Sequence, residues 1–260
     1  MQQKLTLTLV QPDILWEQPQ KNLDSYRQKI EQLNKKPDIV VLPEMFTTGF
    51  SMNPQKVAEG WPGQSLRWMI DQSVLHQTVI CGSLMVKVND RYYNRFVWVE
   101  PDGTQYFYDK RHLFQMGGEH EVYSAGSEQL FIDYKGWRIA PFICYDLRFP
   151  VWSRNASAYD LALYVANWPA ARAAVWKKLL MARAIENQCF VAGVNRVGTD
   201  GRGLKYSGDS MLVNARGEVQ ECLTPGIDEV KTVTIDREEL SEFRKKFPVL
   251  TDADNFELKP

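Results

Sequence analysis

The sequence has no long apolar segment and no recognisable leader. No apolar run approaches the ~20 consecutive residues that a helix needs to cross a bilayer, which argues against a membrane span and a membrane partner. Segment 1–6 lacks the positively charged and apolar regions of a secretory signal peptide. These two absences predict a cytoplasmic protein.

An excess of charge of either sign is also absent. The 31 Lys and Arg residues almost balance the 32 Asp and Glu residues, and the net charge is −1 at pH 7. A strongly basic surface is therefore not expected, so nucleic acid is not a predicted partner. The 260 residues are 44% hydrophobic and 24% charged. This composition is typical of a globular protein long enough to bury a substantial core.

Cysteine and histidine are scarce. The four cysteines are Cys81, Cys144, Cys189 and Cys222, and no two of them have the C-x-x-C spacing of a zinc or thioredoxin site. In a reducing cytosol they are expected to be free thiols. Cys81, Cys189 and Cys222 lie inside apolar segments and are predicted to be core residues. Only three histidines are available as partners for a catalytic thiol.

Strand-like and helix-like segments alternate along the chain without a low-complexity linker. Alternating or continuous apolar runs predict strands, and apolar residues at helical spacing predict helices. The predicted strands cover residues 4–10, 38–42, 78–88, 92–100, 104–108, 129–134, 137–143, 161–165, 189–195, 210–213, 219–223 and 231–235. The predicted helices cover residues 22–33, 65–76, 150–158, 172–187 and 237–246.

Hairpins mixed with crossover helices predict an α/β fold, in which helices lie outside one mixed sheet or two sheets. The even spacing of the segments favours a single domain over residues 1–260. Its core is expected over about residues 4–235, followed by a C-terminal helix and tail over 236–260.

The predicted strand 137–143 ends abruptly at Cys144, and a charged, helix-opening segment follows. A thiol between a strand and the turn into a helix is exposed at a sheet edge, where nucleophiles act. The local pattern leaves a second interpretation open, because free cysteine often behaves as a small buried hydrophobe.

Glu44 stands at the end of another apolar segment, directly after residues 38–42 and Pro43. A carboxylate that is partly withdrawn from water at such a strand end is a competent general base. The alternative is an ordinary solvated loop carboxylate, which is the commoner situation for glutamate.

Lys110 follows a third strand-like segment, the aromatic run 104–108. A fixed ammonium group can stabilise an oxyanion or favour ionisation of a nearby thiol. Taken alone, this segment favours a surface lysine beside Asp109 and Arg111. A thiolate that attacks a carbonyl carbon needs a base and oxyanion donors, and Glu44, Lys110 and Cys144 supply these roles without histidine.

These three segments closely resemble the Glu-Lys-Cys signatures of the nitrilase (carbon–nitrogen hydrolase) superfamily in order and spacing, and the resemblance extends from the first strand to about Ile235. The motifs are Leu42-Pro43-Glu44, Asp109-Lys110 followed by His112-Leu113-Phe114, and the run 143–150 around Cys144. Further stretches look most like the ω-amidase branch, namely residues 46–50, 165–169, 182–188 and 194–198.

The resemblance implies a four-layer α-β-β-α sandwich with two mixed sheets, paired into a homodimer through helices near the nucleophile, with no cofactor and no metal. It also implies a mechanism. Glu44 takes the proton of Cys144, the thiolate attacks a carboxamide, and Lys110 and the backbone N–H of Tyr145 stabilise the oxyanion. Glu44 then activates the water that hydrolyses the thioester.

Many members of this superfamily carry a second glutamate shortly after the lysine. In the matching stretch 117–126, Glu119 fits the position best, and Glu121 lies close enough to leave the register open. The implied role is to orient Lys110 and the substrate amide. The alternative is again a plain loop carboxylate.

Several other residues are candidates for the substrate pocket. Asn167 and Trp168 follow the strand 161–165 and should lie at the same sheet edge as Cys144. Arg148 could pair with a substrate carboxylate, or equally with a neighbouring acidic side chain. Phe46 and Tyr123 could form walls of the pocket.

Taken with the resemblance, the sequence predicts an ω-amidase. Such an enzyme hydrolyses the terminal carboxamide of a short dicarboxylic monoamide, such as 2-oxoglutaramate or 2-oxosuccinamate, and releases ammonia. The alternatives are another amidase or an N-carbamoyl hydrolase of the superfamily, since pocket shape sets specificity, and a non-catalytic binding protein on the same scaffold.

Overall fold

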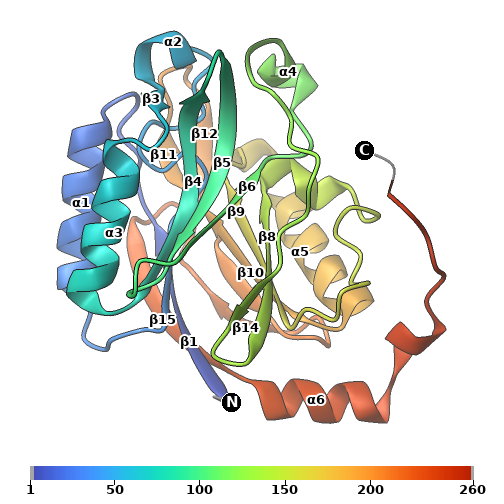
Figure 1. The fold of residues 1–260 in the computed structure, drawn as a ribbon. Coiled ribbons are helices and arrows are strands. Elements are labelled where there is room, and N and C mark those ends of the chain that lie inside the picture. Colours follow the sequence, from blue (N-terminus) through green and yellow to red (C-terminus); the bar gives the residue numbers. More distant parts are fainter. Residues whose placement is uncertain (1–2, 259–260) are drawn as a thin grey trace.

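Two mixed β-sheets stack face to face in the computed structural model, which describes residues 3–258 (Figure 1). The first sheet has the order β15 (Glu229–Asp236), β1 (Lys4–Gln11), β2 (Ile39–Val41), β4 (Val79–Val88), β5 (Arg91–Val99) and β6 (Gln105–Asp109), and the short β3 (Glu59–Gly60) pairs with β4. The second sheet has the order β14 (Val219–Cys222), β13 (Met211–Val213), β10 (Phe190–Asn195), β9 (Leu161–Ala166), β8 (Trp137–Ile143) and β7 (Ile132–Tyr134).

Three neighbouring strands run parallel in each sheet, and antiparallel strands flank them. In the first sheet these are β1, β2 and β4, and in the second sheet they are β8, β9 and β10. The carboxyl ends of parallel strands meet at one edge of a sheet, so residues that directly follow them gather there.

The alternation of side chains along β2 explains the layers. Ile39 and Val41 belong to the core between the two sheets, whereas Val40 packs in a second core beneath α1 (Pro19–Glu31) and α3 (Gln64–His76). Every second side chain of a strand points to the same face, so a short apolar run serves both cores. The first sheet is thereby covered on both faces.

Helix α5 (Ala173–Asn187) covers the outer face of the second sheet, and α6 (Arg237–Lys246) follows at its end (Figure 1). Trp176 and Leu180 of α5 are completely buried against this sheet. The side chain of Asp236 caps α6 by accepting from the Glu238 backbone N–H at 2.9 Å. The four-layer α-β-β-α sandwich is therefore confirmed.

Most predicted elements are present within a few residues of their expected limits, but the helix expected over 150–158 is wrong. That segment forms turns. The Asn155 side chain accepts from the Tyr159 N–H at 2.8 Å and donates to the Tyr159 carbonyl at 2.9 Å, and Ala158 has a positive φ of 56°. Side-chain bonds to the local backbone replace the helical ones.

The prediction that Cys222 is a core residue is also wrong, because this cysteine is exposed. It lies on β14, the edge strand of the second sheet, where most residues face solvent. Cys81 and Cys189 are buried, as predicted. The short antiparallel pair β11 (Val197–Thr199) and β12 (Lys205–Ser207) was not predicted.

Candidate active site

Three strand ends meet between the two sheets. Glu44 follows β2 and Lys110 follows β6 in the first sheet, and Cys144 follows β8 in the second sheet. β6 is antiparallel to β5, which is antiparallel to β4, so β6 ends at the same edge as β2. The stacking of the sheets brings Cys144 opposite the two charged residues.

Lys110 lies between two carboxylates in a buried ionic cluster. Its Nζ donates to Glu44 Oε1 at 2.9 Å and to both oxygens of Glu119 at 3.0 and 2.9 Å. All three side chains are 0% exposed. Glu119, on the short helix α4 (Glu119–Val122), is therefore the second carboxylate that contacts Lys110, whereas Glu121 is exposed.

The charges of this cluster shift the pKa values of Lys110 and Glu119. Burial alone would lower the pKa of Lys110, but the charges of Glu119 and Glu44 outweigh burial and hold that pKa above its usual range. Burial raises the pKa of Glu119, Lys110 opposes this effect, and the charge of Glu44 adds to it. Lys110 is consequently a permanent cation, locked in place by two acceptors.

Two asparagines orient Glu44. The sequence analysis did not identify the first, Asn94, and identified the second, Asn167, only as a pocket residue. Asn94 on β5 donates to Glu44 Oε1 at 2.8 Å. The Asn167 backbone N–H donates to Glu44 Oε2 at 2.7 Å, and the Asn167 Nδ2 donates to the Glu44 carbonyl at 2.6 Å. The Asn167 Oδ1 is buried without a hydrogen-bond partner among residues 3–258. Asn94 is the one amide side chain of β5, where it lies between Tyr93 and Arg95.

Cys144 occupies a strained turn between β8 and the 3₁₀ helix η2 (Cys144–Arg148). Its φ is +45°, a left-handed conformation that is unfavourable for a residue with a Cβ. Such a turn projects the side chain out of the sheet edge, as at other strand–turn–helix nucleophiles. Tyr145 is in the first turn of η2, where backbone N–H groups have no intrahelical acceptor.

The pKa of the Cys144 thiol is raised well above its usual value. Burial is the largest cause, and the charge of Glu44 and a hydrogen bond to it add to the rise, while Lys110 opposes it. Lys110 does lower the pKa of the thiol, as expected, but burial and the charge of Glu44 raise it by more. The resting group at neutral pH is a thiol that faces a carboxylate.

Asp146 ties the turn at Cys144 to the loop after Lys110. Its Oδ2 accepts from the Ile143 N–H at 3.0 Å and from the Tyr108 hydroxyl at 2.7 Å. Its Oδ1 accepts from the His112 N–H at 3.0 Å and lies 2.8 Å from His112 Nδ1. The buried carboxylate therefore fixes the turn at Cys144 relative to the first sheet.

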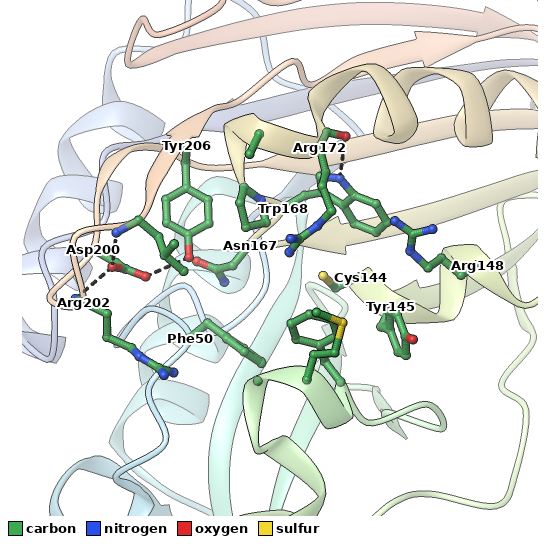
Figure 2. Close-up of a pocket in the computed structure, with 16 residues that line it drawn as sticks. Phe50, Cys144, Tyr145, Arg148, Asn167, Trp168, Arg172, Asp200, Arg202 and Tyr206 are labelled. Atoms are coloured by element: carbon green, nitrogen blue, oxygen red, sulfur yellow. Dashed lines mark hydrogen bonds between the residues drawn. The ribbon is translucent and has the colours of Figure 1, made fainter.

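A cavity of about 370 Å³ opens above Cys144 (Figure 2). This volume is near the lower end of the range of ligand pockets, roughly 300–1,000 Å³, and suits a small substrate. The lining residues are Phe50, Phe114, Met116, Gly117, Cys144, Tyr145, Arg148, Asn167, Trp168, Pro169, Ala171, Arg172, Asp200, Arg202, Leu204 and Tyr206.

Tyr145, Arg148, Asn167 and Trp168, which the sequence assigned to the pocket, are all in this lining. Phe46 is not, and its assignment to the pocket wall is wrong. It is completely buried beneath the first sheet, with ring centroids 5.5 Å from Tyr26 and 6.2 Å from Trp68. The pocket uses Phe50 instead, four residues further along.

Tyr123 is also not in the pocket lining. Its hydroxyl donates to the Ser51 carbonyl at 2.7 Å, and its ring packs with Met45 and Met85 behind the ionic cluster. A buried tyrosine needs a partner for its hydroxyl, and here the backbone after Phe50 supplies it. Tyr123 therefore supports the loop that carries Phe50.

The sequence did not indicate most of the outer lining, which includes Phe50, Phe114, Arg172, Asp200 and Tyr206. These residues come from loops, from a short 3₁₀ helix that contains Arg172 and from β12, far apart in the chain. They carry no local signal, because an aromatic or charged residue in a loop is compatible with many positions.

No group of three or more His, Cys, Asp or Glu side chains within residues 3–258 could hold a metal ion. None of the helices in that part of the chain is long and apolar enough to cross a membrane.

Comparison with known proteins places this arrangement in a family. The carbon-nitrogen hydrolase family model matches residues 6–245. The omega-amidase YafV of Yersinia enterocolitica is 48% identical over 252 residues, which cover 97% of this chain and 98% of that protein. The 2-oxoglutaramate amidase of Bacillus subtilis (strain 168) is 34% identical, with coverage of 96% and 97%.

A solved structure extends the similarity to three dimensions. XC1258 from Xanthomonas campestris, a CN-hydrolase superfamily protein with an arsenic adduct in its active site, superposes with a TM-score of 0.96 at 44% identity, and the match covers 99% of this chain and 100% of that one. The fold, the order of the strand-end residues and these matches agree, and the chain belongs to the carbon-nitrogen hydrolase family.

Proposed function

We propose that this protein is an ω-amidase, which hydrolyses the terminal carboxamide of short dicarboxylic monoamides such as 2-oxoglutaramate and 2-oxosuccinamate to the dicarboxylate and ammonia. The observation that carries the proposal is the cluster of Glu44, Lys110 and Glu119 beside Cys144 at the base of a small cavity. The names of the full-length relatives, omega-amidase and 2-oxoglutaramate amidase, support the substrate class.

In the acylation step, the sulfur of Cys144 attacks the amide carbon while the thiol proton passes to Glu44. The raised pKa of the thiol makes this coupled transfer the productive route, because little free thiolate is present beforehand. Lys110 Nζ and the Tyr145 N–H donate to the oxyanion. Glu44 returns the proton to the nitrogen, the C–N bond breaks, and ammonia leaves a thioester.

In the deacylation step, Glu44 takes a proton from water, and the resulting hydroxide attacks the thioester carbon. The C–S bond breaks, and the sulfur recovers the proton from Glu44. One carboxylate thus serves as base and as acid in both halves of the reaction. Its two oxygens are held by Lys110, Asn94 and Asn167, so it keeps its orientation throughout.

A panel of substrates tests this function. Purified protein should release ammonia from 2-oxoglutaramate and 2-oxosuccinamate much faster than from N-carbamoyl amino acids or nitriles. Preferential cleavage of N-carbamoyl compounds or nitriles would replace the ω-amidase proposal with another activity of the same family. Binding of the monoamides without any turnover would favour a non-catalytic protein.

We also propose that the protein is a cytoplasmic homodimer, and that each chain is a single domain whose core over about residues 4–235 is followed by a C-terminal helix and tail. Support for pairing comes from two exposed apolar residues, Val151 at 56% and Ile185 at 54% exposure. Their segments are joined by the bond from the Asn155 N–H to Asn187 Oδ1 at 2.9 Å. Light scattering of the purified protein should give twice the 30.0 kDa chain mass, and Val151→Asp should reduce it to that of one chain.

A further inference from the structure

Three arginines line the cavity above Cys144, namely Arg148, Arg172 and Arg202. The lining of this cavity also includes one carboxylate, that of Asp200. No ion pair joins any of these arginines to a carboxylate within residues 3–258. The outer part of the pocket therefore carries excess positive charge, which favours an anionic substrate.

Asp200 offsets one of these three positive charges but forms no ion pair with an arginine in the described part of the chain, because its oxygens accept hydrogen bonds from other groups. Oδ1 accepts from the backbone N–H groups of Arg202 and Leu204, both at 2.9 Å, and Oδ2 accepts from the Tyr206 hydroxyl at 2.8 Å. The carboxylate holds the turn before β12 in shape. It leaves the arginine side chains available for a ligand.

The three arginines differ in where their guanidinium groups lie. That of Arg148 lies 5.2 Å from the centroid of the Trp168 ring, and in Figure 2 it rests against the side of that ring away from the cavity centre. Arg202 is exposed, and in the same view its guanidinium lies beyond Phe50 as seen from Cys144.

Arg172 alone reaches over the middle of the cavity. Figure 2 shows its side chain descending from the 3₁₀ helix η3 (Ala170–Arg172) toward Cys144. The guanidinium lies 5.5 Å from the centroid of the Phe114 ring, which belongs to the opposite wall. The Arg172 carbonyl accepts from the Trp168 indole N–H at 2.9 Å, so the backbone that carries this side chain is anchored.

We propose that Arg172 binds the carboxylate of the substrate and thereby selects monoamides that carry a free carboxylate over neutral amides of the same length. This inference rests on the proposed ω-amidase function. An amide carbon at Cys144 and a carboxylate at Arg172 share one cavity of about 370 Å³. A guanidinium binds a carboxylate with two parallel hydrogen bonds, so a short substrate in this cavity can place its amide at Cys144 and its carboxylate at Arg172.

The test compares glutaramate, which has a carboxylate, with pentanamide, which has the same chain length and none. In the Arg172→Met variant, kcat/KM for glutaramate should fall about 30- to 100-fold, the scale of lost charge-assisted hydrogen bonds, while kcat/KM for pentanamide should stay within about 3-fold of wild type. Arg172→Lys should recover part of the loss, because it keeps the charge without the two-pronged geometry.

Arg216→Met is the matched control. Arg216 also places its guanidinium over a phenyl ring, 4.5 Å from the Phe243 centroid, but lies outside the cavity lining. It should behave as wild type on both substrates.

Equal losses on glutaramate and pentanamide in Arg172→Met, or a charge-selective loss in Arg148→Met or Arg202→Met instead, would overturn the assignment. If wild-type protein released ammonia from no dicarboxylic monoamide, the proposed function itself would fail.

Discussion

The floor and the mouth of the pocket are built in opposite ways. The floor consists of Glu44, Lys110, Glu119 and Cys144, and its three charged side chains are 0% exposed. The mouth consists of Met116, Arg148, Arg172 and Arg202, where Met116 is 89% exposed. Charges in the floor are paired at fixed distances, whereas those in the mouth have no carboxylate partners within residues 3–258.

The difference separates chemistry from selectivity. Buried charges persist only when they are paired and hydrogen-bonded, so each floor residue depends on the others, and the geometry has little freedom. Exposed charges cost little and can change without loss of the fold. We therefore expect changes in the floor to reduce the rate for every substrate, and changes in the mouth to alter which substrate is bound.

The largest effect is expected from removing the nucleophile. Cys144→Ala should lower kcat by about 10⁴-fold or more, because no other group can form the thioester. Ammonia release from 2-oxoglutaramate measures the loss. Cys222→Ala is the control for thiol removal, since Cys222 is exposed on an edge strand, and it should keep wild-type activity. Substantial turnover by Cys144→Ala would exclude a covalent mechanism.

Removing the base should be almost as damaging. Glu44→Gln should reduce kcat by about 10³- to 10⁴-fold, the upper range for loss of a general base. The same change should lower the pKa of Cys144, because the charge of Glu44 helps to raise it. The thiol would then ionise at lower pH than in wild type and yet react more slowly.

A pH titration of thiolate absorbance follows this shift, with the Cys144→Ala protein as the blank. In wild type, the Cys144 thiol should stay protonated through neutral pH, since neutral pH is below its raised pKa. An unchanged titration in Glu44→Gln would show that the carboxylate is not coupled to the thiol. Nearly normal turnover would instead favour a preformed thiolate that needs no carboxylate base.

Glu119→Gln should have a smaller effect on the floor. The amide can still accept one bond from Lys110, but it loses the charge that holds the ammonium, so we expect kcat to fall about 10²-fold, near the loss of one oxyanion donor. Glu121→Gln is a matched control on the same short helix, because Glu121 is exposed. Equal losses in both variants would place the second glutamate in doubt.

The smallest effect is expected beside the mouth, at the turn that carries Arg202. Tyr206→Phe removes the hydroxyl that donates to Asp200 Oδ2 at 2.8 Å, but leaves the two backbone donors to Oδ1. One such hydrogen bond contributes about 0.5–1.5 kcal/mol, so KM should rise about 2- to 10-fold while kcat hardly changes. Steady-state kinetics separates the two constants. A loss confined to kcat would mean that the mouth takes part in the chemistry.

Three of the four floor residues could be predicted from the sequence because each stands at the end of a strand-like run. Glu44 after 38–42, Lys110 after 104–108 and Cys144 after 137–143 share this pattern, and their order matches one superfamily. For the fourth, Glu119 fits the position best, but Glu121 lies close enough to leave the register open. The structure separates them by burial and by the contacts to Lys110.

The mouth could not be predicted in the same way. Phe46 and Phe50 lie only four residues apart, and the sequence does not show which of them lines the pocket. In the structure Phe46 packs against Tyr26 and Trp68, whereas Phe50 lines the pocket. Arg172 opens a long helix and reads locally as an ordinary surface residue. Its significance comes from Phe114 on the opposite wall, 58 residues earlier in the chain.

The sequence by itself determined the alternation of strands and helices, the family, and the three residues at the strand ends, because periodicity and local order are written along the chain. Only the tertiary structure decided which charges are buried together, why Cys144 rests as a thiol, and which arginine faces it. These properties depend on the stacking of two sheets and on loops that meet in space, and residues distant in sequence set them through burial and charge.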